Sequence, residues 1–112
     1  MNFLAAEARP GGRIAFAGIE IDNPTKSPLD SGSLQLGLRP EHLDENDGVG
    51  LEATVDIVEA LGSTSYVHAT LTTGEAVIAE RRAFRDRIGD RITLRFAPHS
   101  IRLFANAGRR IR

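Results

Sequence analysis

The chain has 112 residues, of which 41% are hydrophobic and 26% are charged, and its formal net charge at pH 7 is −1. These values are typical of one small soluble domain with a single core, and they require neither disorder nor a tail that binds polyanions. The absence of cysteine excludes disulfides, thiolate metal sites and cysteine nucleophiles, and it fits the reducing conditions of the cytoplasm.

The predicted secondary structure is entirely β. Short segments alternate between apolar and polar residues, and no segment keeps a helical period for more than about two turns. Strands of this length and spacing favour a closed or partly closed small barrel. We expect about seven short strands, which in chain order are residues 13–21, 33–39, 51–60, 65–72, 76–80, 91–96 and 101–104.

Turn residues lie between these strands, where the chain must reverse. Glycine supplies the positive φ that such turns need at Pro10-Gly11-Gly12, Asn46-Asp47-Gly48, Leu61-Gly62-Ser63 and Thr73-Gly74. Residues 22–33 contain Pro24 and Pro28 and are expected to form a long exposed loop. Residues 82–87 are expected to form a helical turn before Gly89.

One pattern occurs twice, and it consists of a glycine, an alternating strand and then a proline. The first copy runs from Gly32 to Pro40 and the second from Gly89 to Pro98. Because a solenoid needs several copies, the pattern supports only the placement of these two strands.

Charge is distributed unevenly between the two halves of the chain. Residues 1–60 hold four basic and eleven acidic side chains, whereas residues 61–112 hold ten arginines and four acids. If the halves interleave in the fold, the charges can form cross-strand pairs, and if they segregate, they create a bipolar surface suited to docking. The residues alone leave both arrangements open, although charged strand faces are usually just solvated.

The motif for ATP hydrolysis is absent from the sequence. A P-loop needs the pattern G-x-x-x-x-G-K-[ST], because its lysine and hydroxyl contact phosphate and Mg²⁺. The nearest glycine spacing, from Gly32 to Gly37, continues with Leu38 and Arg39 inside an expected strand. We therefore expect no P-loop ATPase activity in this chain.

Other catalytic and metal-binding patterns are also missing. His42, His68 and His99 are widely separated and lack metal-ligand spacing. Ser63 and Ser65 have no nucleophile elbow and no assigned base, so we expect them to be turn residues. The sequence predicts no catalytic residue, no bound metal and no enzyme activity.

Nucleic acid is not an expected partner. An OB-type barrel that binds single strands presents aromatic residues over a basic groove, and this chain has only one tyrosine and five phenylalanines. The arginines between residues 81 and 95 form a local basic cluster, but acidic residues interrupt it. Phe16, Phe96 and Phe104 lie in alternating apolar strands and are expected in the core.

The clearest motif is Leu36-Gly37-Leu38-Arg39-Pro40-Glu41-His42-Leu43, a strand that leads into a turn at a proline. Proline keeps the preceding residue extended and suits the first helical position, and an acid suits the positive end of a short turn. The string also closely resembles the signature of the C-terminal domain of maltose-type and glycerol-phosphate-type ABC transporter ATPases, often called a TOBE domain. Three further strings follow the order of that family, at residues 1–4, 55–62 and 89–104.

The resemblance implies an OB-like barrel that acts as a non-catalytic C-terminal regulatory and dimerisation domain. The matching residues are Arg39, Pro40, Glu41 and His42 in the turn, Glu59, Leu61 and Gly62 in a strand-to-turn element, and Phe104 in the last strand. Glu59 and Phe104 are the main candidates for an interface. The alternatives are that Glu59 caps a turn and that Phe104 is a core aromatic.

The resemblance also implies that the chain is part of a longer ATP-binding subunit that energises the import of a sugar or related solute, with Met1 internal to that protein. ATP and Mg²⁺ would bind in the nucleotide-binding domain, outside this chain. The expected partners are a second copy of the ATPase subunit, the membrane subunits of the transporter and a cytosolic regulatory protein. The expected location is cytoplasmic, on the inner face of the cell membrane, and the sequence itself has neither a signal peptide nor an apolar run of membrane length.

A different class of function stays open at this point. Barrel domains related to the TOBE domain bind oxyanions such as molybdate through backbone amides and hydroxyls at subunit interfaces. Ser63, Thr64 and Ser65, which follow Gly62, offer such groups.

Overall fold

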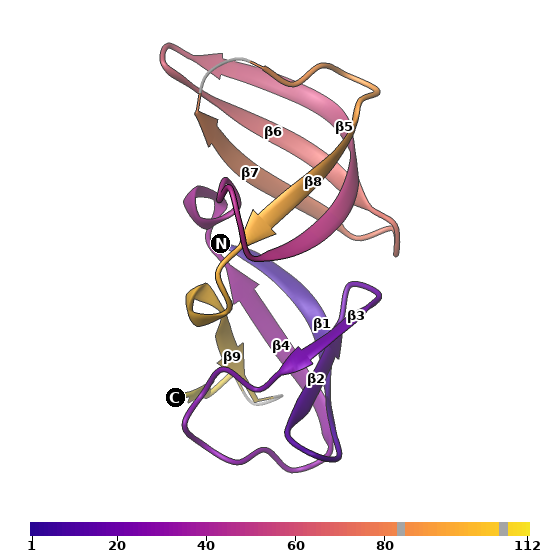
Figure 1. The fold of residues 1–112 in the computed structure, drawn as a ribbon, viewed down its shortest axis with the longest axis vertical. Coiled ribbons are helices and arrows are strands. Elements are labelled where there is room, and N and C mark those ends of the chain that lie inside the picture. The colour runs from indigo at the N-terminus through magenta and orange to yellow at the C-terminus, as the bar shows by residue number, and fades with distance from the viewer. Residues whose placement is uncertain (83–84, 106–107) are drawn as a thin grey trace.

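Ten β-strands and two 3₁₀ turns form the regular structure of the residues that the computed structural model describes, which are 1–82, 85–105 and 108–112 (Figure 1). The strands are β1 (Asn2–Arg9), β2 (Arg13–Phe16), β3 (Ile19–Asp22), β4 (Gly32–Leu38), β5 (Val49–Leu61), β6 (Thr64–Leu71), β7 (Ala76–Arg82), β8 (Arg91–Phe96), β9 (Arg102–Phe104) and β10 (Arg110–Ile111). The 3₁₀ turns are η1 (Pro40–His42) and η2 (Pro98–Ser100). The all-β prediction is confirmed, and none of the described segments is a helix that could cross a membrane.

The strands form two antiparallel sheets, which lie one above the other along the long axis in Figure 1. Sheet I has the strand order β10-β9-β4-β1-β2-β3, and sheet II has the order β7-β6-β5-β8. Sheet II curls around its own inner face as a half-barrel, which agrees with the expected OB-like fold (Figure 1).

Alternation along the strands builds one core that includes side chains from both sheets. Leu36 and Leu103 of sheet I are fully buried, as are Leu94 and Phe96 of sheet II. Phe16 of β2 packs against Phe96 of β8 with ring centroids 6.1 Å apart, so the two sheets share one hydrophobic cluster. Each large apolar side chain stabilises the fold by roughly 1.5–3 kcal/mol when it is fully buried.

Both 3₁₀ turns carry the chain from one sheet to the other. The chain leaves sheet I through η1 after β4, and it returns from sheet II through η2 after β8. In each case the residue before the proline, Arg39 or Ala97, is extended, and the proline begins the turn. The pattern of glycine, strand and proline that occurs twice in the sequence therefore marks the two crossings between sheets.

A β-bulge in β5 decides which side chains of sheet II face solvent. Val55 pairs with Ala69 of β6, but the next pair is Ile57 with His68, so β5 contains one extra residue. Val55 is buried, whereas Ile57 is 53% exposed and Glu59 is also exposed. Without the extra residue, the two-residue period of the strand would turn both Ile57 and Glu59 toward the core.

Several elements differ from the prediction. The expected strand at 13–21 is two strands, β2 and β3, because the chain turns at Ala17 and Gly18. β1 and β10 were not expected, and they account for the rest of the additional strands. The helical turn expected at 82–87 is not found where the chain is described, since Arg82 ends β7 and residues 85–87 are irregular, while residues 83–84 lie outside the described residues. The predicted hairpin turns at Gly62 and Gly74 are confirmed.

Candidate functional site

The structure places the eight predicted site residues at three separate positions. The turn η1 and the residue before it contain Arg39, Pro40, Glu41 and His42, the end of β5 and its hairpin turn contain Glu59, Leu61 and Gly62, and β9 ends with Phe104. The first group lies between the two sheets, the second on sheet II and the third on sheet I. The residues therefore do not converge on a single pocket.

The signature motif forms the crossing turn itself. The backbone N–H of His42 donates to the carbonyl oxygen of Arg39 at 3.0 Å, and that of Leu43 donates to Pro40 at 3.3 Å. Glu41 is exposed and does not cap the turn with its side chain. Nδ1 of His42 is buried and has no hydrogen-bond partner within the described ranges. The first role of the motif is therefore structural, because it ends β4 and directs the chain toward sheet II.

A buried ion cluster lies directly after the signature, and sequence reasoning missed it. Asp44 is 7% exposed, and its Oδ2 accepts the backbone N–H of Arg82 at 2.8 Å. Its carboxylate also contacts the guanidinium groups of Arg82 and Arg85 and lies 3.6 Å from that of Arg81. Arg81 is itself buried and forms a second ion pair with Asp86 at 3.0 Å. The cluster fastens the segment after η1 to the end of β7.

The same cluster lowers the pKa of Asp44. Burial acts in the opposite direction, because removal from water disfavours the charged carboxylate. The hydrogen bond from the Arg82 amide and the positive charges of Arg85 and Arg81 outweigh burial and hold the pKa of Asp44 below its usual value of 3.8. The carboxylate is therefore ionised at neutral pH, and it acts as an ion-pair partner rather than as a proton donor.

The outer face of sheet II carries the predicted interface residue Glu59. Its Oε1 lies 2.5 Å from Nε2 of His68 on β6, so Glu59 pairs across strands instead of capping a turn. Ile57 lies opposite His68, Tyr66 lies opposite Glu59, and Ile78 of β7 is the other neighbour of His68. The apolar members Ile57, Tyr66 and Ile78 are 53%, 37% and 37% exposed. We call these five residues the sheet II patch.

Sequence reasoning did not identify the three apolar members of this patch. The alternation of β5 by itself indicates an inward position for Ile57, and only its pairing with His68 reveals that the bulge turns it outward. Tyr66 and Ile78 alternate with buried neighbours on β6 and β7, so they occupy outward positions. Apolar residues at outward positions are the signal that identifies such a patch.

Leu61 and Gly62 lie at the tip of the β5–β6 hairpin. Leu61 is 49% exposed, and Gly62 has a φ of 79°. Of the neighbouring hydroxyl residues, Ser63 is exposed, Thr64 is half-buried and Ser65 is fully buried. The three hydroxyl groups therefore do not gather on one surface, which weakens the case for an oxyanion site at this hairpin.

Phe104 lies on the outer face of sheet I rather than in the core. It is half-buried, and its ring meets that of Phe3 edge-on, with centroids 5.8 Å apart and an interplanar angle of 66°. Phe3 is 52% exposed. The prediction of a core aromatic holds for Phe16 and Phe96 but is wrong for Phe104. A role of Phe104 in an interface stays a prediction.

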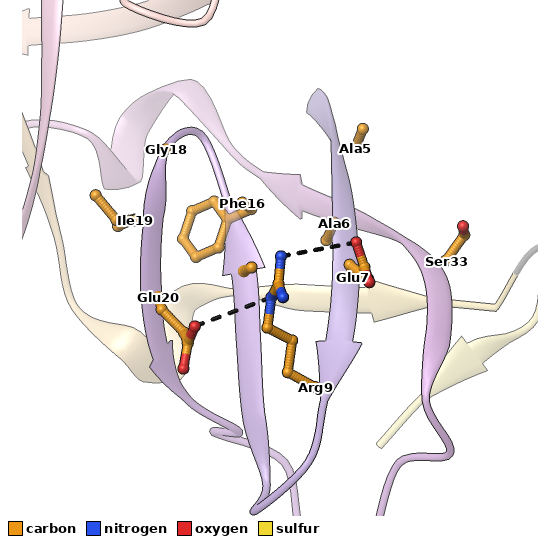
Figure 2. A pocket seen from close by; sticks show the side chains of 10 residues that line it. Ala5, Ala6, Glu7, Arg9, Phe16, Gly18, Ile19, Glu20 and Ser33 are labelled. Carbon is orange, nitrogen blue, oxygen red and sulfur yellow. Dashed lines mark ion pairs between the residues drawn. The ribbon is translucent and has the colours of Figure 1, made fainter.

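A shallow hollow of about 620 Å³ opens on the outer side of β1, β2 and β3 (Figure 2). Arg9 lies across it, with guanidinium nitrogens 3.9 Å from a carboxylate oxygen of Glu7 and 3.9 Å from one of Glu20. Phe16 and Ile19 line the hollow as well (Figure 2). Because its three charged side chains pair with one another, the hollow offers no unpaired charge to a ligand.

The three histidines lie apart from one another, on η1, β6 and η2. Across the described part of the chain, no three His, Asp or Glu side chains gather as a metal ion would require. The absence of a metal or cofactor in this chain stays a prediction.

Comparison with known proteins finds relatives along the whole chain. The chain is similar to the lactose transport ATP-binding protein LacK of Rhizobium radiobacter, with 37% identity over 125 residues that cover 100% of this chain and 34% of that protein. It is also similar to the sn-glycerol-3-phosphate import ATP-binding protein UgpC of Vibrio vulnificus (strain CMCP6), with 32% identity over 117 residues, 99% of this chain and 31% of that protein. The chain thus spans about a third of the length of these relatives.

A family model described as a TOBE domain matches residues 36–104. The matched range is more than half of the chain, and it includes the signature turn, the sheet II patch and Phe104. All eight predicted site residues therefore lie within it. This match, on an all-β fold with a curled sheet, shows that the chain belongs to the TOBE-domain family.

Proposed function

We propose that the chain is the non-catalytic regulatory and dimerisation domain of an ATP-binding subunit that energises the import of a sugar or related solute. The observation that carries this proposal is the similarity to LacK and UgpC, whose names describe ATP-binding proteins of lactose transport and of sn-glycerol-3-phosphate import. The chain matches about a third of each relative and has no P-loop, so we assign ATP, Mg²⁺ and hydrolysis to the rest of the subunit.

In this proposal the main partner of the domain is a second copy of the same subunit. A contact that persists while the nucleotide-binding domains open and close keeps their effective concentration high, so even a weak contact is sufficient. The membrane subunits of the transporter then contact the parent protein on the cytoplasmic side of the membrane, where a regulatory protein can also reach it.

We assign the pairing contact to the sheet II patch. Ile57, Tyr66 and Ile78 bring apolar surface to one face of adjacent strands, and exposed apolar groups with an aromatic member are typical of interface centres. Glu59 and His68 already pair with each other, so the patch can be buried without leaving that carboxylate unpaired. A contact between two identical patches is isologous and closes as a dimer.

The substitution Ile57→Glu tests this assignment in the complete ATP-binding protein that carries the chain. In an isologous contact the new carboxylate meets apolar surface of the partner, so we expect the dimer dissociation constant to rise about tenfold or more. ATP hydrolysis per subunit should fall as this pairing weakens. Sedimentation velocity over a concentration series measures pairing, and a phosphate-release assay measures hydrolysis.

Ile88→Glu is the matched control, because Ile88 is 72% exposed and lies in the turn before β8, outside the patch. If Ile57→Glu and Ile88→Glu pair equally well, the sheet II patch is not the contact. If removal of residues 1–112 leaves both pairing and ATP hydrolysis unchanged, the proposed function itself is wrong.

A further inference from the structure

The outer face of sheet I brings arginines and aromatic rings together. Phe104 of β9 lies opposite Arg110 of β10. Arg102 of β9 lies opposite Gly37 of β4, and Gly37 lies opposite Phe3 of β1. Because residues two apart on a strand share a face, Arg102 and Phe104 face the same side of the sheet.

Two further arginines extend this group. Arg112 follows β10, whose antiparallel pairing with β9 places it level with Arg102. Arg39 follows β4 in an extended conformation, two residues after Gly37, and so lies at the end of the same face. We call Arg39, Arg102, Arg110 and Arg112 the arginine patch.

No acidic side chain neutralises the arginine patch in the part of the chain that the structure describes. None of its four members belongs to an ion pair there, and Arg102 donates only to backbone carbonyl oxygens. The pKa of Arg110 is lowered, first by desolvation and then by the positive charges of the other three members. The guanidinium groups of the other three members therefore repel that of Arg110, and an anionic partner would relieve this repulsion.

Apolar side chains lie beside these charges on the same face. A Cβ at Gly37 would lie 2.5 Å from Sδ of Met1 and 3.3 Å from Cε2 of Phe104, so these two side chains cover the gap that the glycine leaves. Met1 and Phe3 are 46% and 52% exposed. Exposed aromatic rings together with arginine are the residue types enriched at the centres of protein interfaces.

From this arrangement we propose that the arginine patch, with Phe3 and Phe104, is a docking surface for an acidic segment of another protein. Carboxylates of the segment pair with the guanidinium groups, and one of its apolar side chains packs against the two rings. Guanidinium and carboxylate groups form bidentate pairs, which fix the register of the bound segment. This surface lies on sheet I and the sheet II patch on the other sheet, so the inference goes beyond the pairing function.

The geometry favours a protein segment over other anionic partners. Single-stranded nucleic acid stacks its bases on open aromatic faces, but Phe3 and Phe104 meet edge-on at 66° and do not form a stacking platform. An anionic lipid surface takes up a protruding apolar anchor, whereas Phe104 is half-buried and Phe3 packs edge-on against it. A second copy is less suitable because the acids of sheet I, Glu7, Glu20 and Asp22, already pair with Arg9 or Arg13 of the same sheet.

Fluorescence anisotropy on the full chain of 112 residues tests the proposal. The probe is a short labelled peptide of alternating Asp and Glu with one central Leu. We expect saturable binding that weakens as NaCl is added, because salt screens exposed charges. In the double variant Arg102→Gln, Arg110→Gln we expect the Kd to rise about tenfold or more, since two charge-assisted contacts are lost.

The matched control is the double variant Arg87→Gln, Arg91→Gln, which removes two exposed arginines that form no ion pair in the described residues and lie away from the patch. A normal Kd in this control supports the proposal, and equal weakening in both double variants overturns it. No measurable binding, or tighter binding to oligothymidine or to phosphatidylserine vesicles than to the peptide, overturns it as well. Circular dichroism checks that each variant folds, and Phe3→Ser, which leaves all four arginines in place, should also weaken binding.

Discussion

Asp44 shows how one buried charge is stabilised at the junction of the two sheets. In the variant Asp44→Asn the amide keeps an acceptor for the backbone N–H of Arg82 but no charge for Arg85 and Arg81. We therefore expect the free energy of unfolding at pH 7 to fall by about 1–3 kcal/mol, as for other lost hydrogen bonds to charged groups. Urea unfolding measures the difference, and Glu45→Gln, at an exposed neighbouring acid, is the control for the loss of one negative charge.

The same variant changes the acid sensitivity of the protein. Because the pKa of Asp44 in the folded state lies below its usual value of 3.8, the ion cluster contributes its full stability above pH 3.8, and this contribution is lost as pH falls through the folded pKa. The difference in unfolding free energy between the original protein and Asp44→Asn should be constant from neutral pH to about 5 and should shrink at lower pH. A difference that does not change down to pH 2 would contradict this account.

Particular residues also show which features of the site could be predicted from the sequence and which could not. The signature turn was predictable, because proline, acid and glycine positions act locally. The ion cluster was not, since the Arg82 N–H that holds Asp44 comes from a residue 38 positions further along the chain. From the sequence alone, an acid directly after a turn is expected to be exposed to solvent. Asp44 is buried only because β7 packs against η1 in the fold.

At the scale of elements, two glycines determine how β5 begins and ends. Gly48 and Gly62 both have positive φ, 104° and 79°. A Cβ at Gly48 would lie 2.4 Å from the backbone oxygen of Phe96, whereas a Cβ at Gly62 would meet nothing within 4 Å. Gly62→Ala should therefore destabilise the protein by about 1–2 kcal/mol through backbone strain alone, and Gly48→Ala by about 3 kcal/mol or more. Thermal unfolding of the two variants compares them directly, and equal losses would show that the contact with Phe96 relaxes freely.

The elements differ in how well their sequences predict them. β8 was predicted with its observed bounds, because Ile92, Leu94 and Phe96 alternate with polar residues between a turn glycine and a proline. β1 was not predicted, because two of its inward residues, Ala6 and Ala8, are weak strand formers. The bulge in β5 could not be seen in the sequence, because the pattern of apolar residues continues through it and only the pairing with β6 reveals the extra residue.

At the scale of the whole molecule, the uneven charge of the two halves has two outcomes. Asp44 from the first half pairs with Arg81, Arg82 and Arg85 from the second, so the halves do interleave. The arginines of the last strands instead gather with Arg39 on one face of sheet I. The interleaved and the segregated arrangement of charge are therefore both present. The segregated arginines, which no acidic side chain neutralises in the described residues, form the docking surface proposed above.

The shared core predicts that the two sheets unfold together as one domain. Phe16 of sheet I and Phe96 of sheet II belong to one hydrophobic cluster, so loss of one sheet exposes the core side chains of the other. We expect a single calorimetric transition in which the calorimetric and van't Hoff enthalpies agree. Phe16→Leu should destabilise that one transition by about 1–2 kcal/mol, and Phe3→Leu, the same change at a ring that is 52% exposed, by about 0.5 kcal/mol or less. Two separate transitions, with Phe16→Leu shifting only one of them, would show instead that each sheet is a folding unit of its own.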